Sequence, residues 1–586
     1  MKFSEFCAYL TKLESISSRN EMVVVLAELY KNLGNDVAEA TYLLQGRVAP
    51  LFLPIEFSFS GKSLLKAFAV KFPKAESEPL YKKLGDFGLL AEQLCKNSKS
   101  SGLDIKEVHV RLTEITAVQG KNSQTGKQQL FLELLAKLSA EEAKYVCRII
   151  IGTLRLGLSD KTVLDAFSWM ISGDKSLRAE IEYAFGVNAD LGVIATILKE
   201  KGIDELKKIS AQPGIPIAVK LVEREKTVAD VFERFGKCIV QAKYDGLRAE
   251  VHFSKKGFKS VSTTPMDLGT SQEQVRIFSR RMESLTVMLS DVAAAISKFK
   301  VDSIILDGEA IGYDPKTGEN VQFQETMKRK RKNDIEETAK GIPLKVFCFD
   351  ILLLNGKDLL KTPLQERLAI LKKVLAENKS PTFVYSESPV VDKVEVLQKK
   401  FDEYVEQGLE GMIVKGLDTT YEPGTRNYDW VKLKAASQSH LADTVDAVVL
   451  GYYAGAGQRT KFGIGAILIG YYDEKQGKFF SLAKVGTGIK DEQWGQIRGR
   501  LDKIKVNKLP DNVVVAKNLI PDVIVNPEVI VVVESDSISA SKVHGGEGGG
   551  GYSLRFPRLK EFDRLDKKAT ETTTPKELDK LFKLQG

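Results

Sequence analysis

From Met1 to about Gln212, apolar residues recur at helical spacing along the chain. In "SRNEMVVVLAELYKNL" Ser18 precedes Glu21 by three residues, and in "SAEEAKYVCRIIIGTLRLGLSDKTVLDAF" a serine again precedes a glutamate by three. This spacing ahead of an apolar run is typical of a capping box at a helix N-terminus. The pattern predicts a bundle of helices.

The helical pattern ends at "SAQPGIPIAVK", where two prolines and a glycine interrupt it. From there to about Ser437, strand-like runs such as "SIILDGEAIGYD" alternate with helical runs such as "PLQERLAILKKVLAE". The run "CIVQAKYDGLRAEVHF", from Cys238 to Phe253, alternates apolar and polar residues on both sides of Lys243, as a half-buried strand does. From Asp443 onwards, short strands with glycine-rich turns predict a small barrel, followed by a basic tail that ends in a short helix.

The composition is that of a globular protein with several domains. The chain has 586 residues, enough for about three or four domains of ~150 residues. Hydrophobic residues make up 43% and charged residues 28%. The formal net charge of +8, from 86 basic and 78 acidic residues, permits a polyanionic partner without requiring one. The elements and their order predict a multi-domain α+β fold.

The cysteines and the N-terminus indicate the compartment. The five cysteines are scattered, and none is close enough to another to form a CxxC metal or redox pair. They are expected to be reduced thiols in a cytosolic compartment. The start "MKFSEFCAYLTKLES" is too polar for a signal peptide, and no run approaches the ~18 apolar residues of a membrane span. The sequence therefore predicts a soluble, cytoplasmic protein with no membrane partner.

Lys243 is the first candidate for chemistry. Asp245 follows it by two residues and Arg248 by five, with Gly246 between them. Such a lysine could simply form a surface ion pair with the nearby carboxylate. It could instead be a covalent nucleophile, because a lysine amine attacks when desolvation or nearby cations keep it neutral. Gly246 would then let the backbone approach a nucleotide, and Arg248 would bind phosphate or sugar oxygens.

Further candidate residues stand at the ends of other apolar runs. Each has a plain explanation alone: Phe349 is most simply a core aromatic, although beside a nucleotide it would stack on a base. Two lysines alternate with apolar residues in "WVKLK", so both project from one face of a strand. Together the charged residues would supply carboxylates for a divalent cation and cations for a triphosphate: Glu309, Glu410, Lys415, Arg426, Lys432 and Lys434.

Six motifs occur in the order found in the covalent nucleotidyltransferases, a superfamily of DNA ligases, RNA ligases and mRNA capping enzymes. They are "KYDGLR", "IFSRR", "LDGEAIGYD", "VFCFDILLLNG", "LEGMIVK" and "WVKLK". The stretch "RIIIGTLRLGLSDKTVLDAF" is similar to the DNA-binding domain of archaeal and eukaryotic replicative ligases. The ending "SLRFPRLKEFDRLDKKATETTTPKEL" resembles the last motif of ATP-dependent DNA ligases, with matching residues at Arg555, Arg558, Asp566 and Lys567. The resemblance covers nearly the whole chain.

The resemblance implies three domains and an activity. The domains would be a helical DNA-binding domain (1–215), a mixed α/β nucleotidyltransferase or adenylation domain (216–438) and an OB-fold β-barrel (439–586) with the basic C-terminal motif. The enzyme would seal nicks in duplex DNA, using ATP and Mg²⁺. Lys243 would attack the α-phosphate of ATP to form lysyl-AMP. The AMP would then pass to the 5′-phosphate at the nick, and the 3′-hydroxyl would displace it.

The resemblance also assigns roles to the other residues. Arg248 and Glu309 would hold the ribose, and Phe349 the adenine. Glu410 and Glu309 would bind Mg²⁺, which takes few carboxylates together with phosphate oxygens. The remaining cations would contact phosphates: Arg280 and Arg426 the phosphate end, Lys432 and Lys434 the α-phosphate, and Arg555 and Lys567 the β- and γ-phosphates once the C-terminal domain closes.

Contacts with backbone phosphates would dominate DNA binding, because a nick has no sequence of its own. On the helical domain Lys144, Arg148 and Arg155 are candidates for these contacts, although a solvated basic face is the plain alternative. The run "MKRKRKND" is a phosphate-binding edge or a nuclear signal, and the family favours the former. A monomer is expected, and binding to a sliding clamp stays open.

Three features depart from the family pattern. Gln241 stands two residues before the lysine, where the family usually carries a glutamate. If this side chain contacts adenine, the choice of nucleotide could change; if only its backbone does, little changes. The stretch 255–274 is longer than the usual hairpin turn, and the glycine-rich "GGEGGGGYSLRF" predicts a loose tether before the last motif.

Several rival functions are open at this point. A GTP-using capping guanylyltransferase shares the lysine motif but lacks the long helical domain and this ending, and an RNA ligase is a similar alternative. A NAD-dependent DNA ligase would carry a Cys₄ zinc site, which these scattered cysteines cannot form. A non-catalytic nick-binding scaffold would have no need of Lys243, Glu309, Glu410 and Lys432. Whether ADP, NAD⁺ or GTP can replace ATP stays open.

Overall fold

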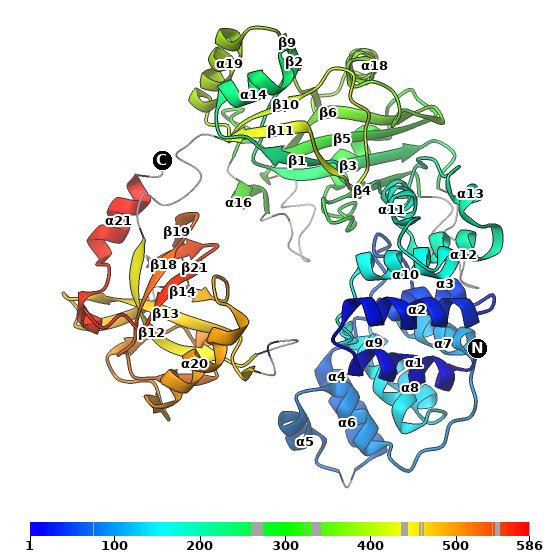
Figure 1. Cartoon of the computed structure of the whole chain (residues 1–586), viewed down its shortest axis with the longest axis vertical. Helices are drawn as coiled ribbons and strands as arrows, with labels where there is room; N and C mark the ends of the chain where they lie inside the picture. Colours follow the sequence, from blue (N-terminus) through cyan, green and yellow to red (C-terminus); the bar gives the residue numbers. More distant parts are fainter. Residues whose placement is uncertain are drawn as a thin grey trace. The chain divides into compact units, whose positions relative to one another are not determined.

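The computed structural model describes residues 1–584 of the chain except 74, 259–272, 322, 328, 330–340, 435–443, 456–458, 460–461, 542 and 545–550. The chain divides into two compact units, Met1–Leu433 and Lys434–Gly586, and each is considered by itself (Figure 1). Three features of the sequence fall largely or wholly outside the described residues: the long 255–274 stretch, the basic run "MKRKRKND" and the glycine-rich segment before the last motif.

The first part of unit one is helical, as predicted. Ser139 Oγ accepts a hydrogen bond from the Glu142 N–H (3.3 Å) and the Glu142 carboxylate accepts one from the Ser139 N–H (2.7 Å), so helix α9 starts with a complete capping box. Ser18 Oγ caps α2 by accepting from the Glu21 N–H at 3.4 Å. The apolar faces of these helices form one buried core. The helices are α1 (Phe3–Ser15), α2 (Arg19–Asn32), α3 (Val37–Leu44), α4 (Gly61–Lys71), α5 (Ser77–Leu84), α6 (Phe87–Leu94), α7 (Ile105–Ala117), α8 (Ser123–Leu135), α9 (Ala140–Ile151), α10 (Asp160–Ser172), α11 (Arg178–Val187), α12 (Leu191–Lys201) and α13 (Ile203–Leu206).

Two β-sheets form the second part of unit one. The first has the strand order β1-β11-β10-β2-β9, and the second β4-β3-β5-β6-β7 with β8 beside β6. Helices α14 and α19 cover β2 and β10, and α18 lies against β6 (Figure 1). The strands are β1 (Leu221–Arg224), β2 (Cys238–Ala242), β3 (Leu247–Ser254), β4 (Val275–Phe278), β5 (Ser303–Gly312), β6 (Leu344–Leu354), β7 (Lys357–Asp358), β8 (Phe383–Tyr385), β9 (Val390–Val391), β10 (Gly411–Lys415) and β11 (Arg426–Lys434). The helices are α14 (Val228–Phe235), α15 (Ser290–Ile296), α16 (Phe323–Met327), α18 (Leu364–Glu377) and α19 (Val394–Glu406).

The two sheets are joined directly by the connection from β2 to β3. The sequence pattern predicted strand on both sides of Lys243, and both strands are present. Lys243 itself lies just past the end of β2, where the chain leaves the first sheet and enters the second. The nucleophile candidate is therefore held at the junction of two sheets, with strands of both within reach.

The proline-containing segment 211–220 connects the helices to these sheets. The Ile217 N–H donates a hydrogen bond to the Glu250 carboxylate on β3 (2.8 Å). The Phe52 ring also meets the Phe278 ring of β4 edge-on, with centroids 6.1 Å apart. Both contacts lie within unit one, so the helical part and the sheets are packed together there.

Unit two is rich in short strands and turns, as the sequence predicted. An eight-stranded sheet has the path β15-β17-β12-β13-β14-β16, with β18 and β21 paired beside it, and β19 and β20 form a hairpin. The strands are β12 (Val445–Tyr453), β13 (Ala466–Asp473), β14 (Lys478–Val485), β15 (Lys505–Val506), β16 (Val513–Val514), β17 (Val523–Val525), β18 (Ile530–Glu534), β19 (Ser537–Ser541), β20 (Gly551–Arg555) and β21 (Arg558–Phe562), and the helices are α20 (Asp491–Asp502) and α21 (Pro575–Lys583). The short C-terminal helix predicted from the basic tail is α21.

The order of parts agrees with the predicted fold class: helices first, a mixed middle and a β-rich end. The predicted domain limits at residues 215 and 438 stay predictions. Among the residues that the structure describes, no helix is both long enough and apolar enough to cross a membrane.

Candidate active site

Lys243 lies beside the first residues of β10. Its N–H donates to the Gly411 carbonyl at 3.0 Å, and its own carbonyl accepts from the Glu410 N–H at 3.1 Å. This pairing brings the two side chains together, and the Lys243 Nζ forms an ion pair with the Glu410 carboxylate. The Lys243 side chain is 21% exposed, so a ligand can reach its amine.

Glu309 completes a cluster of charges around this lysine. It lies on β5 opposite Arg248 of β3. Burial raises the pKa of Glu309 to about 7; Arg248 and Lys243 oppose this effect, whereas Asp245 and Glu410 add to it. The predicted nucleophile, both predicted metal ligands and the predicted ribose-binding arginine therefore influence one another electrostatically in one site.

Arg248 is anchored by two residues that the sequence analysis did not single out. Its Nη2 donates to the Asp307 carboxylate and, at 3.1 Å, to the Tyr421 hydroxyl. The guanidinium is buried, and for its Nε no hydrogen-bond partner is found among the described residues. A buried N–H without a partner is costly. The site therefore has a donor in place for a ligand oxygen.

Phe349 and Gln241 lie next to each other at the side of this cluster. The Phe349 ring is 5.6 Å from the Arg248 guanidinium carbon. Gln241 is buried, and its Nε2 donates to the Phe349 carbonyl (3.1 Å) and to the Ser388 hydroxyl (2.8 Å). The departure from the usual glutamate thus has a structural consequence, because a carboxylate cannot donate either of these hydrogen bonds.

Gly246 is explained by the fold itself. A Cβ added there would lie 2.8 Å from the Ala310 carbonyl oxygen and 2.9 Å from the Glu309 Cγ. The glycine allows β3 to leave the turn close to β5, which carries Glu309. The expectation that Gly246 makes room for a nucleotide is therefore not needed to explain this residue.

The cations of β11 lie on the strand next to the edge strand β1 of the first sheet. Lys432 is the register partner of Arg224 on β1. Lys432 and Lys434 are half-buried and alternate with the buried Val431 and Leu433, which agrees with the predicted shared strand face. At the other end of the strand the Arg426 side chain is exposed, with its Nη1 3.9 Å from the Glu223 carboxylate.

The other predicted phosphate ligands lie in different parts of the structure, and those of unit two are described within that unit alone. Arg280 is exposed in the turn that follows β4. Arg555 is exposed at the end of β20, and Lys567 donates to the Asp446 carboxylate; both belong to unit two.

Three family models match the chain in order. The model described as "DNA ligase N terminus" matches residues 2–168, "ATP dependent DNA ligase domain" matches 266–434, and "ATP dependent DNA ligase C terminal region" matches 460–567. A probable DNA ligase from Dictyoglomus turgidum is 41% identical over 595 residues, covering 100% of this chain and 98% of that protein. The chain belongs to the ATP-dependent DNA ligase family.

Further comparisons agree with this assignment. A DNA ligase from Thermoplasma volcanium is 34% identical to the ligase over 602 residues, covering 100% of this chain and 98% of that one. The solved structure of Pmar-Lig_Pre has the same fold, with a TM-score of 0.54, 17% identity and coverage of 95% of this chain and 98% of that one. The predicted family and fold class are confirmed, and these comparisons do not favour a capping enzyme, an RNA ligase or a non-catalytic scaffold.

Two carboxylates, those of Glu309 and Glu410, are the candidates to bind a magnesium ion in this site. Among the described residues no group of three or more His, Cys, Asp or Glu side chains is arranged to hold a metal. Glu309 and Glu410 are nevertheless near enough for the charge of one to raise the pKa of the other. Magnesium is commonly bound by one or two carboxylates with waters and substrate phosphates. The pair therefore fits a cation that arrives with a nucleotide.

The three predicted DNA-contacting residues have partners within the protein. Lys144 and Arg148 are buried, and both form ion pairs with Glu14 of α1, at 2.9 and 3.0 Å. Burial alone would raise the pKa of Glu14, but hydrogen bonds from Arg148 and Lys144 outweigh it and lower that pKa to about 2. These ion pairs tie α9 to α1, and the prediction that Lys144 and Arg148 contact a DNA backbone stays a prediction.

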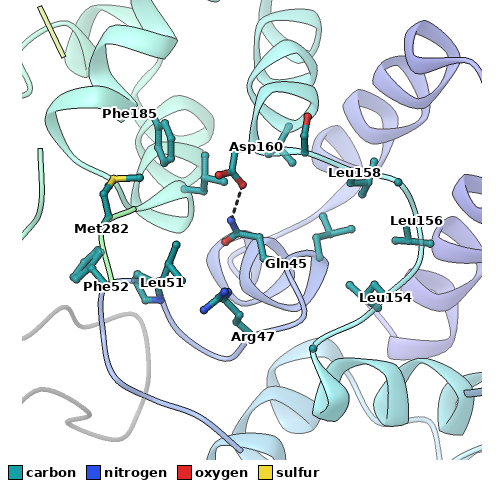
Figure 2. A pocket seen from close by; sticks show the side chains of 18 of the residues that line it. Gln45, Arg47, Leu51, Phe52, Leu154, Leu156, Leu158, Asp160, Phe185 and Met282 are labelled. Carbon is teal, nitrogen blue, oxygen red and sulfur yellow. Dashed lines mark hydrogen bonds between the residues drawn. The ribbon is translucent and has the colours of Figure 1, made fainter. Parts of the chain in front are cut away.

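Arg155 is placed differently. Its side chain is 41% exposed, and it pairs with Asp86 at 2.9 Å. It lies in the loop between α9 and α10 and lines a cavity of about 300 Å³. Arg47, which Figure 2 labels, lines the same cavity. In the lining of this cavity the Gln45 amide donates to the Asp160 carboxylate at 3.1 Å, and Met282 contributes to the lining from the sheet part of unit one (Figure 2).

Proposed function

We propose that this ligase seals nicks in duplex DNA with ATP and Mg²⁺, and that Lys243 carries the AMP. The observation that supports this most is the position of Lys243 at the junction of two sheets, beside Glu410 and close to Glu309 and Arg248. A reachable amine among carboxylates and a guanidinium is what nucleotidyl transfer to lysine requires.

The reaction consists of three displacements at phosphorus. The Lys243 Nζ, after losing a proton, bonds to the α-phosphorus of ATP while the bond to pyrophosphate breaks. The terminal 5′-phosphate of the nick then attacks the lysyl-AMP, so the P–N bond breaks and the lysine amine is regenerated. Finally the 3′-hydroxyl attacks the 5′-phosphate, AMP leaves, and the phosphodiester is closed. Positioning and charge neutralisation supply most of the catalysis in such steps.

Arg248, Glu309 and Phe349 hold the nucleoside in this proposal. The unpartnered Arg248 Nε offers a hydrogen bond to a sugar oxygen, and Glu309 accepts one from a sugar hydroxyl. Phe349 stacks on the adenine. Because the Gln241 Nε2 is engaged by the protein, its Oε1 is the atom left for a base. An acceptor there suits the 6-amino group of adenine better than the 6-oxo group of guanine.

The cations hold the phosphates. Lys432 and Lys434 contact the α-phosphate, Arg280 and Arg426 hold the phosphate end, and Arg555 and Lys567 reach the β- and γ-phosphates when the C-terminal domain closes. Glu309 and Glu410 would hold Mg²⁺, which would supply charge neutralisation at the phosphates when bound.

DNA is bound through its backbone by the helical domain, residues 1–215, together with the adenylation domain (216–438) and the OB-fold domain (439–586). Arg155, whose side chain is exposed, is the phosphate contact that its exposure favours, and the half-buried Arg47 lines the same cavity. The ligase works as a cytoplasmic monomer in replication or repair, and a sliding clamp is an optional partner.

The proposal is tested by incubating the ligase with ATP, Mg²⁺ and a duplex that carries one labelled nick. A joined strand should appear with ATP and not with GTP, and it should be lost in Lys243→Ala. Joining that is faster with GTP, or joining that survives Lys243→Ala, would contradict the proposal.

A further inference from the structure

Strand β10 presents one face to the second sheet, and that face carries a lysine. Lys415 is the register partner of Ile239, and Ile413 is the partner of Gln241, two positions along the same pair of strands. Residues directly opposite each other, and those two apart on one strand, share a face of a sheet. Gln241 and Lys415 therefore lie near each other on the face that meets β6.

The Lys415 ammonium is buried against aromatic rings. The residue is 2% exposed, and its Nζ is 3.9 Å from the centroid of the Trp430 ring and 5.1 Å from that of Phe349. No hydrogen-bond partner is found for this Nζ among the described residues. Burial lowers the pKa of Lys415 to about 8, with Asp350 and Asp307 opposing the shift. A buried cation without hydrogen bonds is costly, so its retention calls for a reason.

The nearby carboxylates act on Lys415 through their charge, and neither forms a hydrogen bond with its Nζ among the described residues. Asp350 accepts two hydrogen bonds from Arg367, at 2.8 and 2.9 Å. Asp307 accepts hydrogen bonds from Arg248 and from the Tyr421 hydroxyl (3.3 Å) through Oδ2, and no hydrogen-bond partner is found for its Oδ1 among the described residues. Lys415 contributes charge balance to this buried group, but its closest contacts are the two rings. A cation held over a ring by burial interacts more strongly than one at the surface.

Phe349 is thus held at two points by the first sheet. Gln241 donates to its backbone carbonyl at 3.1 Å, and the Lys415 ammonium lies over its ring. The Arg248 guanidinium is also near this ring, at 5.6 Å. We propose that Lys415 is a positioning residue for ATP: with Gln241 it fixes the Phe349 ring so that the ring is ready to stack on the base.

This inference rests on the proposed role of Phe349 against adenine. A ring that is fixed before binding loses less conformational freedom when the nucleotide binds. We therefore expect Lys415 to affect the affinity for the nucleotide. Removal of the Lys415 charge should raise the KM for ATP in lysyl-AMP formation by about tenfold. The maximal rate of that step should change little, because Lys415 does not contact the reacting atoms.

The experiment measures KM for ATP and the maximal rate of lysyl-AMP formation in the full-length ligase, with thermal unfolding recorded in parallel. Lys415→Met keeps the length of the side chain and removes the charge. Lys220→Met is the matched control, because the Lys220 side chain is also fully buried and its Nζ lies 5.4 Å from the same Trp430 ring. Phe349→Leu, alone and combined with Lys415→Met, removes the ring through which Lys415 is expected to act.

The expected result is a KM raised about tenfold in Lys415→Met, little change in Lys220→Met, and no further rise when Lys415→Met is added to Phe349→Leu. Equal KM in wild type and Lys415→Met, or additive effects in the double variant, would overturn the inference alone. Absence of lysyl-AMP in the wild type would overturn the proposed function and this inference with it. If Lys415→Met does not fold, Lys415→Leu replaces it. Failure of both to fold would show that Lys415 maintains the fold, and would overturn the inference.

Discussion

The side chains of Lys243, in the connection between β2 and β3, and Glu410 form an ion pair. The backbone holds the two residues together, since the Lys243 N–H donates to the Gly411 carbonyl and the Glu410 N–H donates to the Lys243 carbonyl. An ammonium held in this way is not a nucleophile. If Lys243 is the nucleophile, as proposed, this pair has to separate before the amine attacks.

Glu410→Gln should slow lysyl-AMP formation by about a hundredfold or more, because the amide cannot hold a cation as a carboxylate does. Single-turnover assays with labelled ATP over a range of Mg²⁺ concentrations measure this loss. Glu403→Gln is the control, since Glu403 also pairs with a lysine, Lys400, but on the surface of α19. A Glu410→Gln rate within a few-fold of wild type would show that this carboxylate is not needed.

Arg248→Lys should raise the KM for ATP by about tenfold, because a lysine cannot keep the contacts to Asp307 and Tyr421 and still offer a further donor in the plane of a guanidinium. Steady-state kinetics of lysyl-AMP formation test this prediction. Arg234→Lys alters an exposed arginine that pairs with Glu225 at 2.8 Å and should leave KM unchanged. The same small change in both variants would mean that Arg248 has no special role.

Acid should weaken the helical part of the ligase through Glu14. Its pKa in the folded state is lowered to about 2 from an ordinary value near 4.5, so its contribution to stability is present above pH 4.5 and is lost as the pH falls towards 2. Glu14→Gln should lower the urea midpoint at pH 7 and reduce its dependence on pH in that window, as followed by circular dichroism.

Glu28→Gln is the matched control for Glu14, because Glu28 forms an exposed pair with Lys12 at 3.5 Å. Exposed pairs contribute little, so this variant should behave as wild type does. An unchanged pH dependence in Glu14→Gln would show that the buried network with Lys144 and Arg148 does not stabilise the helices.

Arg155→Gln should weaken binding to nicked DNA and reduce the salt dependence of binding by about one counterion, as expected for the loss of one phosphate contact. Self-adenylylation should not change, because Arg155 belongs to the helical part. Fluorescence anisotropy over a salt series measures the first effect. Arg111→Gln, which alters an exposed arginine on α7, is the control. An equal loss in both variants would mean that binding depends on net charge alone.

Local patterns predicted the elements well. Serine and glutamate three residues apart located the start of α9, because a capping box involves only neighbouring residues. Alternation of apolar and polar residues likewise identified β2 and β3 on either side of Lys243. These predictions succeeded because the forces that decide them act within a few residues of one another.

Local sequence patterns could not predict contacts between segments that are distant in the sequence. Spacing alone gave no sign that Glu410 would meet Lys243; the resemblance to known ligases suggested the grouping, and the pairing of β2 with β10 produces it. The ion pairs that bury Lys144 and Arg148 depend on Glu14 of another helix, α1. Basic residues on an amphipathic helix look alike in a sequence whether water, DNA or a carboxylate faces them.

The central claim is that Lys243 carries AMP, and peptide mapping tests it most directly. The ligase is incubated with ATP and Mg²⁺, digested under conditions that preserve the phosphoramide, and analysed by mass spectrometry. The account predicts AMP on the peptide that contains Lys243, and its loss from that peptide when nicked DNA is added before digestion. AMP attached to another residue, or an adduct on Lys243 that nicked DNA does not remove, would contradict it.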